Sequence, residues 1–406
     1  MPTLKYYVWL SGRVGAVTAG RVLSHFGTPE AAFFAHEDEY KKIEDLDKSD
    51  VQSLCKKELT TASSILARCT ELGHRILTIQ DAEYPERLRN IYDPPIVLYV
   101  KGRLPAIDEE AVVAIVGTRK STPYGMKMSE KCGYELARHG LVVTTGLARG
   151  ADTAAALGAL RGGGCIIGVL GCGLDVIYPA ENGKLYEDVA ACGAIITEYP
   201  PGTPPDGAHF PVRNRIMSGI AVGVAVVEAP LRSGALITAS RALEQGRDVF
   251  TVPGNIDAVM SEGTNSLLRD GAIPLTSPVD IVTEYADIFP LKIKSGEISK
   301  VSLDKRLERE MLATHDKSVI PTGNLTEKTV DKPEPVGYID VEKTALSLAG
   351  DQKAIFEALR KLGGRVHIDD IIEATGITAS DALGSITMLE IEGHVLALPG
   401  SFYTLP

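Results

Sequence analysis

The sequence predicts an α/β protein whose central part is an extended Rossmann-like, doubly wound sheet. Between residues 111 and 289, short apolar runs alternate with segments of helical pattern, as in folds with a parallel sheet. Most of these apolar runs end in a turn that carries a glycine. The most apolar stretch, Ile220–Val227, has the length of a strand and no charge, which is typical of a central parallel strand.

Residues 1–72 are expected to form a small helical domain similar to sterile-alpha-motif or helix-hairpin-helix bundles. Gly15 suits a turn, an amphipathic segment follows it, and Gly27 suits the end of that helix. The turn carries few cations, although some related bundles hold DNA backbones through turn amides. Partner contact or scaffolding is therefore favoured for this domain over DNA binding.

Residues 73–290 are assigned to the Rossmann-like domain. Its first part, 73–110, contains two strand patterns at 74–79 and 96–100. Further strands are expected near 112–117, 141–145, 165–170, 194–198, 221–228 and 248–252. Helices are expected near 124–139, 151–161, 182–191, 213–219, 235–245 and 263–269.

Two more regions follow along the chain. Residues 291–349 are rich in Lys, Glu, Ser, Thr and Pro, which indicates a flexible linker. Residues 350–406 resume a pattern of three helices and a hairpin, the outline of a winged-helix-like domain. The third helix, 378–391, contains no Lys or Arg, so we expect a structural or protein-contact role and no reading of duplex DNA.

Composition restricts the function. A net charge of −11 and a pI near 5.3 disfavour a generally basic nucleic-acid binder, so any nucleic-acid site must concentrate its positive charge locally. The six cysteines lack metal-ligand spacing and suggest a reducing compartment. No leader pattern and no run near the ~20 apolar residues of a membrane span are found, so we expect a cytoplasmic protein without membrane contact.

Candidate ligand residues occupy the turns after successive strands. Because the carboxyl ends of parallel strands share one edge of the sheet, these turns should lie together. Glycines let a backbone approach a ligand, and helix N-termini present free N–H groups to anions. The first two turns contribute Gly117, Thr118, Arg119, Gly146, Arg149 and Gly150. Asp152 could cap the following helix or orient Arg149.

Two later segments complete the predicted groove. Phe210 offers a ring on which a base could stack, although core packing is an equal alternative. The residues expected to bind phosphate there are Arg213, Asn214, Arg215, Ser233 and Gly234. We find no Gly-x-Ser-x-Gly, no metal-ligand set and no Gly-x-Gly-x-x-Gly with its acidic partner, and so expect no catalytic residue, metal or cofactor. The groove suits an extended anion.

Eight motifs occur in an order that resembles the DprA/Smf family of bacterial DNA-processing proteins. They are Tyr84–Leu88, Asp93–Pro95, Val116–Arg119, Gly146–Gly150, Gly171–Asp175, Phe210–Arg215, Ser233-Gly234 and Val252–Gly254. The resemblance implies a homodimer that binds single-stranded DNA without sequence preference and helps load RecA during natural transformation. It also implies a strand-binding pocket at Arg119, extending to Gly146, Arg149, Gly150, Arg213, Asn214 and Arg215.

An alternative class is a Rossmann-type nucleotide sensor or a phosphoribohydrolase-like enzyme. Such enzymes carry a Pro-Gly-Gly-x-Gly-Thr-x-x-Glu motif, of which this chain retains only Val252–Asn255. The chain also departs from the DprA pattern, with Thr145 where serine is common and Ala156 where histidine is frequent. The missing histidine disfavours acid–base chemistry further.

Overall fold

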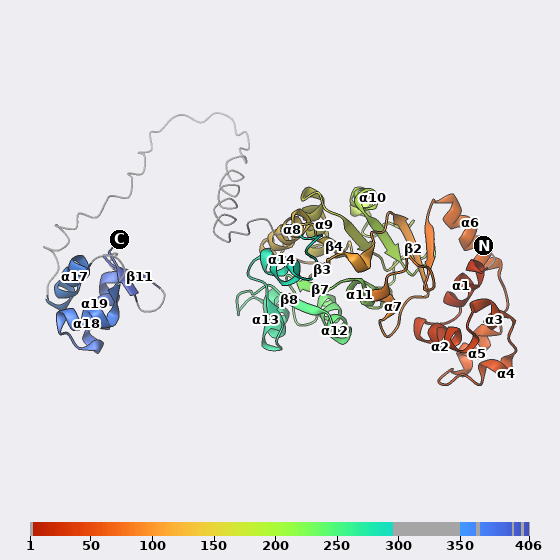
Figure 1. The fold of residues 1–406 in the computed structure, drawn as a ribbon, viewed down its shortest axis with the longest axis horizontal. Helices are drawn as coiled ribbons and strands as arrows, with labels where there is room; N and C mark the ends of the chain where they lie inside the picture. Colours follow the sequence, from red (N-terminus) through yellow and green to blue (C-terminus); the bar gives the residue numbers. More distant parts are fainter. Residues whose placement is uncertain (1–2, 295–349, 363–365, 392–393, 399–401, 406) are drawn as a thin grey trace, which may run out of the picture. The chain divides into compact units, whose positions relative to one another are not determined.

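The computed structural model describes residues 3–294, 350–362, 366–391, 394–398 and 402–405, and the chain divides into two compact units, 1–314 and 315–406 (Figure 1). The predicted linker 291–349 lies outside the described residues from position 295 onward. None of the described helices is long and apolar enough to cross a membrane.

The N-terminal region is helical, as the sequence predicts. Gly27 follows α2 with a φ of 74°, a conformation that glycine adopts without strain, and so ends that helix. The side chains of Trp9, Phe33 and Tyr40 are buried between the helices. The helices are α1 (Leu4–Ser11), α2 (Ala16–Phe26), α3 (Pro29–Phe34), α4 (Glu37–Tyr40), α5 (Lys48–Leu54) and α6 (Thr60–Glu71).

The main sheet contains nine strands of the described chain in the order β1-β2-β6-β5-β4-β3-β7-β8-β9. All pairs from β6 to β9 are parallel, whereas β1–β2 and β2–β6 are antiparallel. The strands are β1 (Arg75–Thr78), β2 (Val97–Gly102), β3 (Val112–Val116), β4 (Val142–Thr145), β5 (Ile166–Val169), β6 (Ala194–Thr197), β7 (Gly223–Val226), β8 (Asp248–Thr251) and β9 (Ile273–Pro274). The two strand patterns of 73–110 thus extend the sheet at one edge.

Helices cover both faces of this sheet, which confirms the predicted doubly wound fold. One buried cluster includes residues of α8 (Pro123–Arg138), α9 (Ala151–Arg161), α10 (Gly183–Cys192) and α14 (Pro278–Ala286). The other includes residues of α7 (Glu86–Arg89), α11 (His209–Ile220) and α12 (Gly234–Glu244). The remaining elements are α13 (Glu262–Arg269) and the short 3-10 helices η1 (Ile107–Glu109), η2 (Ala180–Asn182) and η3 (Val259–Ser261).

Helix α11 begins at His209, earlier than the predicted start at 213. Pro211 lies in the first turn of this helix and lacks a backbone N–H. In the first turn of a helix that N–H has no partner to lose, so the proline is tolerated. The difference matters because it places Phe210 and Pro211 on the helix itself.

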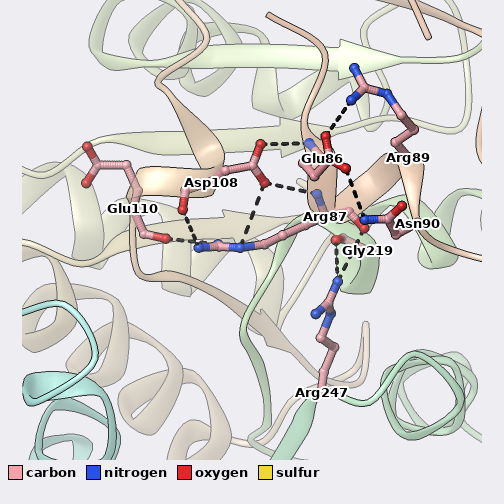
Figure 2. A network of polar contacts seen from close by, with 8 residues as sticks. All are labelled: Glu86, Arg87, Arg89, Asn90, Asp108, Glu110, Gly219 and Arg247. Carbon is pink, nitrogen blue, oxygen red and sulfur yellow. Dashed lines mark hydrogen bonds and ion pairs between the residues drawn. The ribbon is translucent and has the colours of Figure 1, made fainter. Parts of the chain in front are cut away.

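A polar network holds α7, which lies within the Tyr84–Leu88 motif (Figure 2). The Asp108 carboxylate accepts hydrogen bonds from the backbone N–H groups of Glu86 and Arg87, at 2.7 and 2.9 Å, and so caps this short helix. The Arg247 guanidinium donates to the carbonyl oxygens of Arg87 and Gly219, at 3.3 and 3.2 Å. These hydrogen bonds join α7 to Asp108 and, through Arg247, to α11.

The C-terminal unit has the predicted winged-helix outline. Its helices are α17 (Gly350–Leu362), α18 (Ile368–Thr375) and α19 (Ala379–Ile391), which share a small buried core. A three-stranded antiparallel sheet, ordered β10-β12-β11, accompanies them, with β10 (Val366–His367), β11 (Leu396–Leu398) and β12 (Phe402–Thr404).

Candidate nucleic-acid interface

A cavity of about 580 Å³ opens at the carboxyl ends of β3 and β7, which are neighbours in the sheet. From β3 the chain first proceeds through β4, β5 and β6 on one side, and then continues with β7, β8 and β9 on the other. This reversal is the topological switch point, where open α/β sheets bind their ligands. We call this feature the switch-point cavity.

The switch-point cavity brings together eight of the twelve predicted site residues. They are Gly117, Thr118, Arg119, Phe210, Arg213, Asn214, Ser233 and Gly234. Two further cations, Lys120 and Arg232, also line it and were not among the predicted site residues. The sequence could have identified both cations, because each is adjacent to a predicted site residue: Lys120 follows Arg119, and Arg232 precedes Ser233.

Three of the lining cations are exposed and have no acidic partner among the described residues. Arg119, Lys120 and Arg232 form no ion pair with any residue in the described part of the chain. A carboxylate that is paired with a cation must be displaced before a phosphate can bind that cation. Among the described residues, no carboxylate is paired with any of these three side chains. These three side chains therefore place positive charge at the cavity.

Phe210 does not belong to the buried core, and two other side chains already lie against its ring. Its side chain is partly buried, and the Arg119 guanidinium lies over its ring at 4.6 Å from the centroid. The ring of Tyr178 lies on Phe210 as well, with centroids 5.5 Å apart. Phe210 thus holds Arg119 in a fixed orientation, because a planar guanidinium stacks well on an aromatic face.

Helix N-termini also reach the switch-point cavity. Ser233 precedes α12, and its hydroxyl accepts a hydrogen bond from the N–H of Ala235 at 3.3 Å. The first turn of α11 contributes Phe210 and Pro211 to the lining. Free N–H groups and the helix dipole at such ends favour anions. Side-chain cations and the starts of two helices thus line the same cavity.

Arg213 lies deeper than the exposed cations, with 4% of its surface accessible. Its guanidinium donates to the carbonyl oxygen of Val169 and lies against Gly146, where a Cβ atom would be 2.0 Å from Nη1. The neighbouring carboxylate of Asp152 accepts a hydrogen bond from the Gly146 N–H at 3.0 Å. Gly146 therefore makes room for Arg213, and no ligand contact is needed to explain it.

Among the described residues that line the cavity, Asp152 is the single carboxylate and none is a histidine. Burial raises the pKa of Asp152 to about 6, although the positive charge of Arg213 opposes this shift. The idea that Asp152 orients Arg149 is wrong, because the Arg149 guanidinium pairs with Glu181. No cluster of metal-binding side chains occurs among the described residues.

Besides Gly146, three predicted residues lie outside the lining, for reasons that the structure makes clear. Arg149 is exposed and paired with Glu181. Gly150 has a φ of 77°, and a Cβ there would lie 2.5 Å from the Thr118 carbonyl oxygen, so it supports the neighbouring loop. Arg215 is 3% exposed and faces away from the cavity.

The prediction for Arg215 needs a physical correction. Its Nε lies 3.1 Å from Asp93, and its Nη2 donates to Glu198 at 2.7 Å. Residues two positions apart on a helix face different directions, so Arg213 and Arg215 cannot both point into one cavity. Arg215 is therefore a buried structural cation that ties α11 to the Asp93–Pro95 turn.

An open α/β sheet with a cation-lined cavity at its switch point places the protein in the Rossmann-type fold class. Comparison with known families narrows this class: the model for "DNA recombination-mediator protein A" matches residues 75–286, and the "DprA winged helix domain" matches 342–401. The chain belongs to the DprA family, as the resemblance predicted.

Individual relatives agree with this assignment. Protein Smf of Synechocystis sp. is 32% identical over 397 residues, covering 96% of this chain and 95% of its own length. DNA processing protein DprA of Streptococcus pneumoniae is 44% identical over 208 residues, covering 51% of this chain and 73% of its own. The X-ray structure of DprA from that species matches with a TM-score of 0.61 at 35% identity, over 69% of this chain and 96% of that one.

Proposed function

We propose that this protein binds single-stranded DNA in the switch-point cavity, without sequence preference. The observation that carries the proposal is the group of three exposed cations, Arg119, Lys120 and Arg232, which have no acidic partner among the described residues and face one cavity. Each can neutralise a phosphate and release its counterions. Relatives named for DNA processing and a family named for recombination mediation support DNA as the ligand.

The shape of the switch-point cavity and the net charge of the chain support binding of single strands in preference to duplex DNA. In a concave cavity of about 580 Å³, the Arg119 guanidinium over the Phe210 ring offers its outer side to an unstacked base. The chain as a whole has a net charge of −11, which repels a polyanion. A duplex, which is too wide for the cavity, therefore gains little from contact with the outer surface. Stacking and phosphate contacts do not depend on base identity, which accounts for the absence of sequence preference.

Further elements of the proposal concern what happens to the bound strand. The protein acts as a homodimeric, non-enzymatic binder that helps load RecA onto DNA taken up in natural transformation, in the cytoplasm. No bond of the DNA is made or broken in this scheme. A RecA filament-assembly assay on DNA covered by single-strand-binding protein tests it: addition of this protein should shorten the lag.

Calorimetric titration with an oligothymidylate, a mixed-sequence oligonucleotide, a duplex and a mononucleotide tests the assignment. We expect both single strands to bind with similar affinity, and the duplex and the mononucleotide to bind much more weakly. A preference for the mononucleotide would support the nucleotide-sensor alternative and overturn the proposal.

A further inference from the structure

A second, shallow pocket of about 440 Å³ adjoins the switch-point cavity at the start of α12. Arg232, Ser233 and Gly234 line both of them, so the two hollows border the same loop. The remaining wall is aliphatic and consists mainly of Leu231, Leu236 and Ile237. We call this feature the α12 pocket.

The aliphatic wall of the α12 pocket is open to solvent. Leu231 is 57% exposed and Ile237 is 41% exposed, and Leu236 is partly buried. Gly234 and Ile237 lie three positions apart on α12 and therefore share one face of the helix. This face begins at the cationic loop and continues into the apolar wall. A cationic site and an apolar site thus lie within one helical turn.

We propose, building on the proposed function, that the α12 pocket receives a base of the single strand whose phosphates lie in the switch-point cavity. A nucleotide carries an anionic phosphate and a base with apolar faces. Arg232, which has no acidic partner in the described chain, suits the phosphate, and Leu231 and Ile237 suit the faces of the base. Each of the four bases has such a face, so this contact adds affinity without sequence preference.

The size of the α12 pocket favours a base over a protein partner. Its aliphatic wall comprises three side chains, whereas a stable protein interface buries about 800 Å² on each partner. The bordering Arg232 would also have to lose its hydration beside an apolar partner, without a counter-charge in the described chain. A polynucleotide supplies that counter-charge.

The test compares two DNAs on a variant that truncates the wall. Leu231→Ala/Ile237→Ala should bind an oligothymidylate about tenfold more weakly, because a base in the pocket would lose the apolar surface that it contacts. Its affinity for an abasic oligonucleotide of equal length should be unchanged, because that ligand retains only phosphates and sugars. Leu243→Ala is the matched control: Leu243 is 60% exposed on α12 but lies outside the pocket, so both affinities should stay at wild-type values.

Other results would overturn the inference. Unchanged affinity for the oligothymidylate, or an equal loss on both DNAs, would remove the base from the α12 pocket. A changed molecular mass of the double variant in light scattering, with unaltered oligothymidylate affinity, would assign this face to a protein contact. Failure of the proposed function itself would appear differently, as weak, salt-insensitive DNA binding by the wild-type protein.

Discussion

The Glu228 carboxylate at the end of β7 accepts two hydrogen bonds from Thr122, one from the backbone N–H at 2.8 Å and one from the hydroxyl at 2.7 Å. Thr122 is the N-cap residue of α8, and the Glu228 carbonyl oxygen also accepts from the Thr118 N–H at 2.7 Å. The buried glutamate thus fixes both ends of the loop that carries Arg119 and Lys120.

Replacing Thr122 tests this arrangement. Thr122→Val removes the hydroxyl, which leaves a buried acceptor short of one partner and uncaps α8, so stability should fall by about 1–3 kcal/mol. Single-strand affinity should fall too, because the loop cations lose their fixed position. Thr122→Ser keeps the hydroxyl and should restore both urea stability and affinity. Loss of stability with full affinity in Thr122→Val would show that the loop needs no such anchor.

Arg149 should contribute little to DNA binding, in contrast to the prediction from its sequence position. Its guanidinium pairs with Glu181 outside the cavity lining. Arg149→Ala should therefore change the anisotropy-measured affinity less than twofold, because the side chain lies outside the cavity lining and Glu181 neutralises its charge. A loss as large as that of Arg119→Ala would return Arg149 to the binding surface.

Arg215 should matter for stability. Arg215→Met would leave the acids Asp93 and Glu198 without their cation, and breaking a buried ion pair on one side costs about 3–5 kcal/mol. We expect a correspondingly lower urea midpoint. Arg161→Met is the matched control, because Arg161 is exposed and its one ion pair among the described residues is with the half-buried Glu130. Equal midpoints for the two variants would contradict the structural assignment.

Asp152 should make both stability and binding depend on pH. Burial raises its pKa to about 6 in the folded state, above its ordinary value near 4 when unfolded. The folded state therefore binds the proton more tightly, so the contribution of Asp152 to stability is fully present at low pH and is lost as pH rises through about 6. Denaturation at pH 5 and 7 should show wild-type protein gaining about 1 kcal/mol relative to Asp152→Asn at the lower pH.

The same proton should strengthen DNA binding, because it removes a negative charge from the cavity wall. Wild-type affinity should rise between pH 7 and 5 more steeply than that of Asp152→Asn. Parallel pH profiles of the two proteins would show that the Asp152 charge does not act on the ligand.

Periodicity and turn glycines predicted much of the fold, because each strand–helix unit carries its own local pattern. The six central strands, the helical N-terminal region and the winged-helix outline are confirmed. The antiparallel pairing of β2 with β6 was beyond local pattern, since Tyr99 and Thr197 are register partners far apart in the chain. The predicted start of α11, near 213, was later than the observed start at His209, because the ends of a helix carry a weaker periodic signal than its interior.

The site was predicted less completely than the fold. Sequence position identified the switch-point loops, but it could not distinguish Arg213, which lines the cavity, from Arg215, which faces Asp93 and Glu198. That distinction depends on the rotation of one helix. Likewise, the pairing of Arg149 with Glu181 joins two separate loops, and no local pattern reports such a contact.

The salt dependence of single-strand binding tests the central claim most directly. The slope of log affinity against log salt should fall in magnitude by about 0.7 for each cation removed. The triple variant Arg119→Ala/Lys120→Ala/Arg232→Ala should therefore show a slope about two units shallower than wild type, on every sequence tested. A slope equal to that of wild type would mean that the DNA phosphates bind elsewhere, and that the switch-point cavity is not the DNA site.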